Sequence, residues 1–227
     1  MDTSPKASDK LRKGNWKQDP DAVKADILRV ATEEFATYGL SGGRIDAIAK
    51  RSTVSKRMIY YYFGNKEGLY KSVLEGVYAA LRESEETLKV GDLEPTEALA
   101  LLTTTTFDAY AANPEFIRLI AIENIHNAEY LSRSEVIQKL NKTIIDKLAD
   151  VCDRGKAAGQ FRAFADPLEL HWTISAFCFY NVSNQATFSA SFGDTLHSEQ
   201  GQVRLRRRLR DIILGSVVIG YRPENPD

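Results

Sequence analysis

The sequence predicts an all-α protein of about nine helices, in which an N-terminal helix-turn-helix module precedes a larger helical domain. The main observation is that apolar residues recur at helical spacing along most of the chain. No stretch shows the apolar–polar alternation that is typical of a half-buried strand. Prolines and glycines fall where the helical spacing is interrupted, so they mark the ends of helices.

Residues 1–19 are predicted to form a flexible basic arm. They carry five cations and little apolar surface: Lys6, Lys10, Arg12, Lys13 and Lys17. Such a composition favours a disordered, solubilising tail. Contact with the minor groove of DNA, which basic arms of some DNA-binding domains make, is the alternative.

Residues 20–66 are predicted to form the helix-turn-helix module. A first helix covers Asp21 to Tyr38 and is ended by Gly39, a common position for glycine. A short second helix covers Arg44 to Arg51, and a third covers Ser55 to Phe63 after a brief turn. Two short helices joined by a tight turn behind a longer helix define a helix-turn-helix.

The third of these helices has the composition of a DNA-reading helix. Ser55 is placed to cap it, Lys56 and Arg57 lie in its first turn, and three tyrosines follow. The N-terminal residues of a recognition helix reach base edges, while tyrosine hydroxyls and helix N-termini commonly contact phosphates. A tyrosine-rich helix at the edge of a core is the alternative. The predicted DNA-binding residues are Arg44, Ser55, Lys56, Arg57, Met58, Tyr60, Tyr61, Tyr62 and Lys66.

Residues 27–70 resemble the TetR family of bacterial transcription regulators. Segment 31–40 is similar to the end of the family's first helix, and 45–49 to its second helix. Segments 54–63 and 65–70 are similar to its recognition helix and the start of its fourth helix. The resemblance implies a sequence-specific DNA-binding regulator. It further implies a repressor that binds a pseudo-palindromic double-stranded operator as a homodimer and is relieved by an unidentified small-molecule effector.

Two positions depart from the family pattern. The second helix often has a threonine cap, whereas this chain has Gly42 and Gly43, which offer no side-chain acceptor. The turn before the third helix often carries a glycine, whereas this chain has Thr53. A β-branched residue is strained in a left-handed conformation, so either the turn is strained or it is reshaped.

Residues 67–227 are predicted to form a helical domain for effector binding and dimerisation. Six further helices are expected over residues 66–90, 95–112, 114–122, 132–159, 167–191 and 198–220. The last two are unusually apolar for surface helices, and part of that surface needs a partner. In TetR-like proteins these two helices form a four-helix dimer interface, and the resemblance implies the same interface here. Segments 113–119, 166–168 and 214–223 are similar to the subfamily of the pyrimidine-utilisation regulator.

An effector would need a cavity among the central helices. Because ligand pockets are mostly apolar with few polar groups, aromatic side chains and Asn124 are the candidates for its lining. For each residue taken singly, ordinary core packing is the alternative. The predicted effector-binding residues are Phe107, Tyr110, Phe116, Ile120, Asn124, Trp172, Phe177 and Tyr180.

Composition and charge favour a DNA-binding protein over other classes. Residues 1–70 hold 13 Lys or Arg against 9 Asp or Glu, while the remainder holds 17 against 22. Basic charge at the DNA-binding end provides sequence-independent affinity for phosphates. No apolar run approaches the roughly 20 residues of a membrane span, and the N-terminus lacks a signal peptide. We therefore expect a cytoplasmic protein without a membrane partner.

The sequence offers little to catalysis. The three histidines have no partner at metal-ligand spacing, and no glycine-rich phosphate loop occurs. Cys152 and Cys178 suggest neither a metal site nor a disulfide framework, and Cys178 reads as a buried, inert thiol. We expect no metal, no cofactor and no enzymatic activity. A constitutive DNA-binding regulator without an effector is the stronger alternative, and a small helical enzyme is the weaker one.

Overall fold

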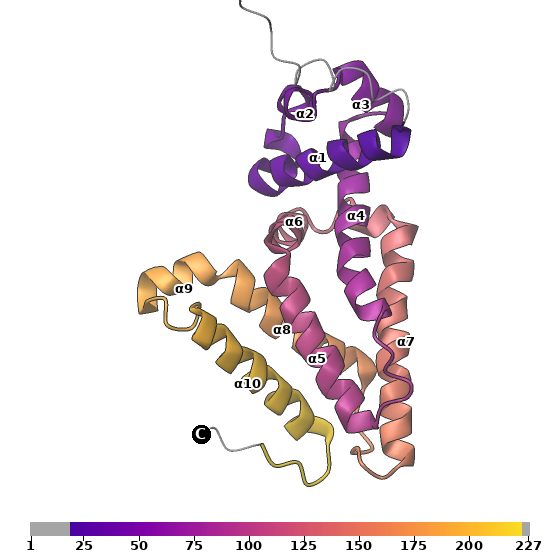
Figure 1. Cartoon of the computed structure of the whole chain (residues 1–227), viewed down its shortest axis with the longest axis vertical. Helices are drawn as coiled ribbons and strands as arrows, with labels where there is room; N and C mark the ends of the chain where they lie inside the picture. Colours follow the sequence, from indigo (N-terminus) through magenta and orange to yellow (C-terminus); the bar gives the residue numbers. More distant parts are fainter. Residues whose placement is uncertain (1–18, 224–227) are drawn as a thin grey trace, which may run out of the picture. The chain divides into compact units, whose positions relative to one another are not determined.

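The computed structural model describes residues 19–223, apart from the side chains of Ser84 and Glu86. All of the predicted basic arm except Asp19 lies outside these residues. The described chain falls into two compact units, an N-terminal unit that ends at Gly76 and a C-terminal unit that begins at Val77. The all-α prediction is confirmed, with ten α-helices and no strand among the described residues (Figure 1).

The N-terminal unit contains α1 (Pro20–Gly42), α2 (Ile45–Arg51), α3 (Lys56–Phe63) and the first part of α4 (Lys66–Glu86). Asp19 accepts a hydrogen bond from the backbone N–H of Ala22 and so caps α1. Gly39 has a φ of 66°, which interrupts α1 where the sequence predicts its end. The residues between Gly39 and α2 form a short additional turn.

The C-terminal unit contains the rest of α4 and six further α-helices. Their bounds are α5 (Pro95–Ala112), α6 (Pro114–Ile125), α7 (Glu135–Ala157), α8 (Pro167–Ser183), α9 (Gln185–Phe192) and α10 (Glu199–Val217), with a 3-10 turn, η2 (Leu131–Arg133), before α7. Helix α5 packs against α7, α8 and α10, so it is the central helix of this unit (Figure 1). Its Leu99 and Leu102 are buried.

The helix expected over residues 167–191 is two helices, and that boundary was wrong. Helix α8 ends at Ser183 and α9 begins at Gln185. The intervening Asn184 has non-helical angles, and its side-chain amide donates to the Ser183 hydroxyl at 2.8 Å. Asparagine and serine compete with the helix through such local hydrogen bonds, which explains the break.

Helices α4 and α10 also end earlier than predicted, and in both cases backbone groups at the end of the helix bond to other parts of the unit. At the end of α4, the backbone carbonyls of Glu85 and Leu88 accept from Lys147 Nζ of α7 at 2.5 and 3.4 Å. Cations commonly satisfy the free carbonyls at a helix end. Helix α10 ends at Val217, because Val218 turns extended and pairs with Phe161 in an isolated antiparallel bridge.

The apolar residues of α10 serve the core of the C-terminal unit more than the sequence suggests. Leu209, Ile213 and Val217 are buried within the single chain. The exposed apolar residues of this helix are Val203 and Ile212.

Cys178 of α8 is also buried, and burial raises the pKa of its thiol to about 12, as expected for an inert cysteine.

None of the described helices combines the length and the apolarity that a membrane crossing requires.

The turn between α2 and α3 is strained rather than reshaped. Thr53 has a φ of 56°, in the left-handed region. Its neighbour Ser52 ends α2, and the Ser52 hydroxyl donates to the Ile48 carbonyl at 2.7 Å. A threonine in the left-handed region costs free energy that a glycine would not.

We predict that Thr53→Gly stabilises the protein. Relief of the left-handed strain outweighs the added freedom of glycine in the unfolded chain, by up to about 1 kcal/mol. Thr53→Ala is the matched control, because it keeps the Cβ atom that makes the conformation unfavourable. Denaturant unfolding of the two variants checks the prediction, and a glycine variant less stable than the alanine variant would contradict it.

Candidate DNA-binding surface and ligand cavity

The helix-turn-helix is held by a small apolar core. Phe35 of α1, Ile48 of α2 and Ile59 of α3 are each fully buried. Phe35 also meets the ring of Tyr70 on α4 edge to face, with 5.3 Å between the ring centroids. Helical spacing of these apolar residues therefore fixes how α1 to α4 pack within the N-terminal unit.

Glu34 of α1 replaces the side-chain cap that α2 lacks. The N-cap residue of α2 is Arg44, whose side chain makes no capping hydrogen bond. Glu34 is only 5% exposed, and its Oε1 accepts from the backbone N–H of Arg44 at 3.0 Å. The preceding Gly43 is required, because a Cβ atom there would lie 2.6 Å from the Phe35 ring. The Gly42–Gly43 departure thus permits a cap from α1.

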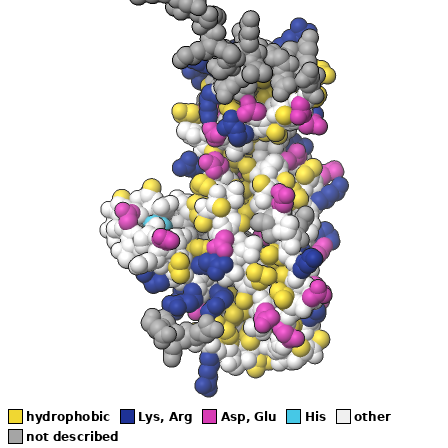
Figure 2. All heavy atoms as spheres, in the orientation of Figure 1, with side chains coloured by type: hydrophobic (Ala, Val, Ile, Leu, Met, Phe, Trp, Pro, Cys, Tyr) yellow, Lys and Arg dark blue, Asp and Glu magenta, His cyan; other side chains and the backbone are white. Residues whose placement is uncertain are grey.

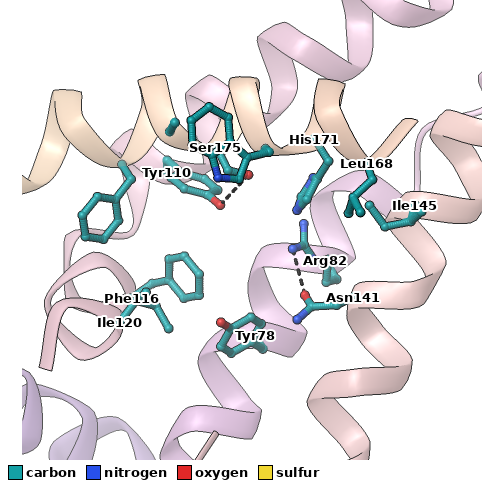
Figure 3. A pocket seen from close by; sticks show the side chains of 13 residues that line it. Tyr78, Arg82, Tyr110, Phe116, Ile120, Asn141, Ile145, Leu168, His171 and Ser175 are labelled. Carbon is teal, nitrogen blue, oxygen red and sulfur yellow. Dashed lines mark hydrogen bonds between the residues drawn. The ribbon is translucent and has the colours of Figure 1, made fainter. Parts of the chain in front are cut away.

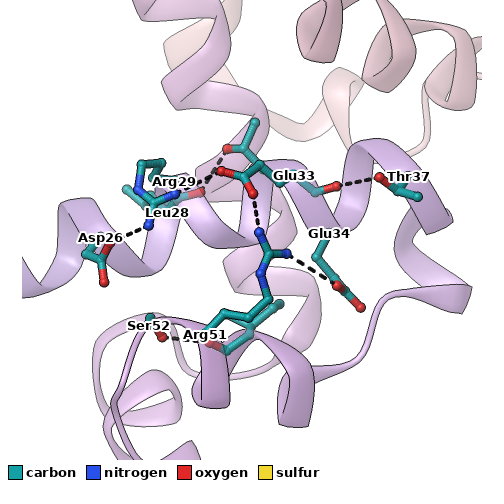
Figure 4. A network of polar contacts seen from close by, with 10 residues as sticks. Asp26, Leu28, Arg29, Glu33, Glu34, Thr37, Arg51 and Ser52 are labelled. Atoms are coloured by element: carbon teal, nitrogen blue, oxygen red, sulfur yellow. Dashed lines mark hydrogen bonds and ion pairs between the residues drawn. The ribbon is translucent and has the colours of Figure 1, made fainter.

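Arg51 at the end of α2 completes this network (Figure 4). Its guanidinium is paired with Glu33 through Nη2 and lies 3.8 Å from Glu34 Oε2 through Nη1. Glu33 also accepts from Arg29 Nη1 at 2.9 Å, and Arg29 Nη2 donates to Asp26 at 2.8 Å. Both ends of α2 are therefore attached to acidic side chains of α1.

Helix α3 presents a continuous exposed stripe. The Ser55 hydroxyl caps the helix by accepting from the backbone N–H of Met58 at 3.2 Å. Opposite Ile59, one face carries side chains at positions i, i+1, i+4 and i+5, which are neighbours on a helix. These four exposed residues are Lys56, Arg57, Tyr60 and Tyr61.

The other predicted DNA-binding residues lie around this stripe. Arg44 and Ser55 are exposed, and Met58, Tyr62 and Lys66 are half-buried. Without DNA, Lys56 pairs with Asp46 of α2. Lys66 Nζ donates to the Ser41 carbonyl at 3.2 Å. DNA phosphates would therefore compete with existing contacts for these two lysines.

Charge elsewhere is mixed. On the face shown in Figure 2, Lys and Arg side chains alternate with Asp and Glu, and apolar side chains are exposed between them. In the arginine-rich segment of α10, Arg206 forms a bidentate pair with Asp108 of α5 through Nε and Nη2, at 2.8 Å each. This arginine is therefore neutralised by an acidic side chain of the same unit.

The C-terminal unit contains a cavity of about 410 Å³ between α4 and α8 (Figure 3). Residues of five helices line it: Tyr78, Arg82, Tyr110, Phe116, Ile120, Asn141, Ile145, Leu168, His171, Trp172, Ser175, Ala176 and Phe179. Leu168 and Trp172 also reach the surface, where they are 63% and 71% exposed. They therefore form the mouth of the cavity.

Arg82 is the charged group of this cavity. It is only 3% exposed, and its Nη1 donates to Glu85 Oε2 at 2.6 Å. Its Nη2 donates to Asn141 Oδ1 at 3.0 Å (Figure 3). Its Nε is buried and has no hydrogen-bond partner among the described residues. An unsatisfied buried donor is costly, so this atom needs explanation.

The remaining polar groups of the cavity are neutral. Burial and the charge of Arg82 lower the pKa of His171 to about 4, so its imidazole is uncharged at pH 7. Burial raises the pKa of Tyr78 to about 12 and also raises that of Tyr110. Both phenols remain protonated, and the Tyr110 hydroxyl donates to Ser175 Oγ at 3.3 Å.

The structure places four of the predicted effector-binding residues in this cavity: Tyr110, Phe116, Ile120 and Trp172. Phe177 and Tyr180 instead line a second cavity of about 300 Å³ between α8 and α10. Phe107 and Asn124 line neither of the two cavities. Phe107 is buried against Phe177, with ring centroids 6.4 Å apart. Asn124 is exposed at the end of α6, because the buried residue there is Glu123.

Sequence reasoning missed the polar side of the cavity, above all Arg82, Asn141 and His171. Arg82 and Glu85 have the spacing of an ordinary surface ion pair on a helix. Its place in the helical pattern could have predicted its burial, since Arg82 adjoins Leu81 and lies one turn beyond Tyr78 on the apolar face of the helix. A charged side chain on the apolar face of a helix is expected to be buried, and a buried charge is a candidate for a functional role.

Comparison with known proteins gives two family matches. Residues 27–73 match the description "Bacterial regulatory proteins, tetR family". Residues 95–213 match "Tetracyclin repressor-like, C-terminal domain". The two matched segments cover most of the helix-turn-helix and the cavity residues of α5 to α8, while Tyr78 and Arg82 of α4 lie between the two segments.

Individual proteins that are similar to this chain are also transcriptional regulators. The chain is 32% identical over 197 residues to the HTH-type transcriptional repressor NicS of Pseudomonas putida, covering 87% of this chain and 93% of the relative. It is 29% identical to the HTH-type transcriptional regulator RutR of Escherichia coli K12, covering 78% and 82%. The crystal structure of the transcriptional regulator SCO4942 of Streptomyces coelicolor is similar, with a TM-score of 0.65 and 27% identity over 86% of this chain and 98% of that one.

We predict that Glu34→Ala destabilises the protein by about 0.5–2 kcal/mol, because the Arg44 N–H at the start of α2 loses its capping acceptor. Glu34→Gln keeps an acceptor for that N–H and loses only the charge that faces Arg51, so its cost is smaller. Denaturant unfolding orders the two variants. Equal stability of the alanine variant and the unmutated protein would show that Glu34 does not hold α2.

Proposed function

Because this chain belongs to the TetR family of bacterial regulatory proteins, and is therefore a DNA-binding transcription regulator rather than an enzyme, we propose that it acts as a homodimeric repressor whose DNA binding responds to a small molecule. Residues 20–66 are the DNA-binding module, and 67–227 bind the effector and form the dimer. The protein acts on a pseudo-palindromic operator in the cytoplasm.

The exposed stripe of α3 is the single observation that carries the DNA-binding role. Recognition helices contact base edges with side chains near their N-terminus, where Lys56 and Arg57 lie. Arginine can donate two hydrogen bonds to guanine, which makes Arg57 the proposed base reader. Tyr61, Tyr62 and Lys66 are proposed phosphate contacts, which give affinity without sequence preference.

The exposed apolar residues of α8 and α10 support a homodimer. On α8 they lie one turn apart, at Leu168, Trp172 and, two turns further, Tyr180, which is 58% exposed. On α10, Val203 is 65% and Ile212 is 44% exposed. Large exposed apolar side chains gathered on two helices favour an interface. Dimerisation would pair two α3 helices for the two halves of an operator.

The cavity supports an effector, and α4 supplies a route for its effect. The same helix contains Lys66, a proposed phosphate contact, and Arg82, a cavity residue. A ligand that prefers one arrangement of α4 shifts DNA affinity by the difference in its own affinity for the two arrangements. Such coupling between sites is typically about 1–3 kcal/mol.

We predict that Arg57→Ala relaxes sequence preference. Loss of a bidentate base contact costs about 1–3 kcal/mol on the preferred site and little on random duplex. Lys66→Ala is the contrasting variant, because loss of a phosphate contact weakens both duplexes alike and lowers the salt slope by about one counterion. Fluorescence anisotropy on both duplexes measures this. An equal loss for Arg57→Ala on the two duplexes would make Arg57 a phosphate contact only.

We predict that Val203→Glu combined with Ile212→Glu converts the dimer to monomers, because each places a charge in an apolar interface. Leu209 and Ile213 of the same helix are unsuitable for this test, because both are buried within the single chain. Val136→Glu, an exposed apolar position at the start of α7, is the control. Sedimentation equilibrium gives the mass, and an unmutated protein that is monomeric at micromolar concentration would refute the proposal.

A further inference from the structure

The guanidinium of Arg82, which lines the cavity, has an unpartnered donor at Nε. Nε and Nη2 lie along one edge of a guanidinium, and their parallel N–H groups match the two oxygens of a carboxylate. Arg206 uses that same edge on the Asp108 carboxylate, at 2.8 Å from each nitrogen. On Arg82, Nε is unpartnered among the described residues and Nη2 meets only the neutral amide of Asn141.

The charges around Arg82 leave it able to bind an anion. Glu85 Oε2 accepts from Nη1, away from Nε, and Glu85 Oε1 accepts from the Thr106 hydroxyl at 2.9 Å. Lys147 adds a second cation, whose Nζ donates to the Glu85 carbonyl at 2.5 Å. Figure 3 shows His171 extending from α8 toward Arg82, where it offers a neutral hydrogen-bonding partner.

The rest of the cavity suits a planar apolar body. Tyr78, Tyr110 and Phe116 meet edge to face, with Phe116 at 5.1 and 5.5 Å from the two tyrosine rings. Trp172 adds a fourth ring at the mouth. Aromatic walls favour the faces and edges of another ring. A volume of about 410 Å³ is near the lower end for ligand pockets, so the ligand is compact.

We propose that this cavity binds a compact aromatic carboxylate, whose carboxylate is held by the Nε edge of Arg82 and whose ring lies among Tyr78, Tyr110 and Phe116. The inference rests on the proposed function for its biological role, and it names the chemical class of the effector. Binding itself can be measured on the free protein, without DNA.

The first test compares acids with their own amides on the unmutated protein. The probes are benzoate, phenylacetate and trans-cinnamate, each against its primary carboxamide, by isothermal titration calorimetry. An amide keeps the shape and removes the charge. We expect at least one acid to bind about tenfold or more tightly than its amide, because hydrogen bonds to a charged group are the stronger ones. If no acid exceeds its amide, the proposal is wrong.

The second test places a competing carboxylate at Arg82. Asn141→Asp keeps an acceptor at Nη2, so Arg82 keeps its partner and the fold is expected to hold. Lys139→Gln makes the same change in net charge at an exposed position on α7 and is the matched control. We expect Asn141→Asp to lower acid affinity about tenfold or more and Lys139→Gln to leave it unchanged. Equal effects of the two variants would overturn the role of Arg82.

A parallel titration of DNA separates this inference from the proposed function. Acid binding with unchanged DNA affinity would keep the carboxylate site and reject its role as an effector site. Loss of acid preference, with DNA affinity still altered by some other small molecule, would reject the carboxylate and keep the regulator.

Discussion

Helix α4 is the constraint on which the rest of the structure depends, because one continuous helix provides core residues to both units. Its first half buries Leu69 and Val73 in the N-terminal unit, and its second half buries Leu81 and Arg82 in the C-terminal unit. The backbone hydrogen bonds of a helix hold such residues at fixed rotation and rise. The coupling that we propose runs along this helix, which contains both Lys66 and Arg82.

The buried charges of Glu34 and Arg82 differ in how completely their hydrogen bonds are satisfied. Glu34 is satisfied by the Arg44 N–H and by Arg51, and so it fixes α2 against α1. Arg82 is paired with Glu85 and Asn141, yet it retains a buried donor at Nε. Burying a charge is expensive unless its hydrogen bonds are completed within the fold. The completed network suits a structural role, and the incomplete one suits a site that a ligand completes.

The helix-turn-helix could be predicted because its signals are local. Ser55 caps α3 from three residues away, and Gly39 interrupts α1 where its spacing ends. The cavity depends on contacts between residues far apart in the sequence, such as Arg82 with Asn141, which no local pattern encodes. Asn124 was proposed as a polar group of the cavity because ligand pockets contain few polar groups, although it lies exposed at the end of α6. The aromatic residues of the cavity could be predicted in part from the sequence. Its polar residues could be identified only from the three-dimensional structure.

The central claim is that occupancy of the cavity and binding of DNA are coupled through α4. The direct measurement is a linkage cycle, in which DNA affinity is measured with and without saturating aromatic acid, and acid affinity with and without saturating DNA. Thermodynamic linkage requires the two factors to be equal, and coupling of about 1–3 kcal/mol makes each about 5- to 150-fold. We predict equal factors in this range, with each ligand weakening the other. An acid that binds tightly while both factors remain at one would contradict the account.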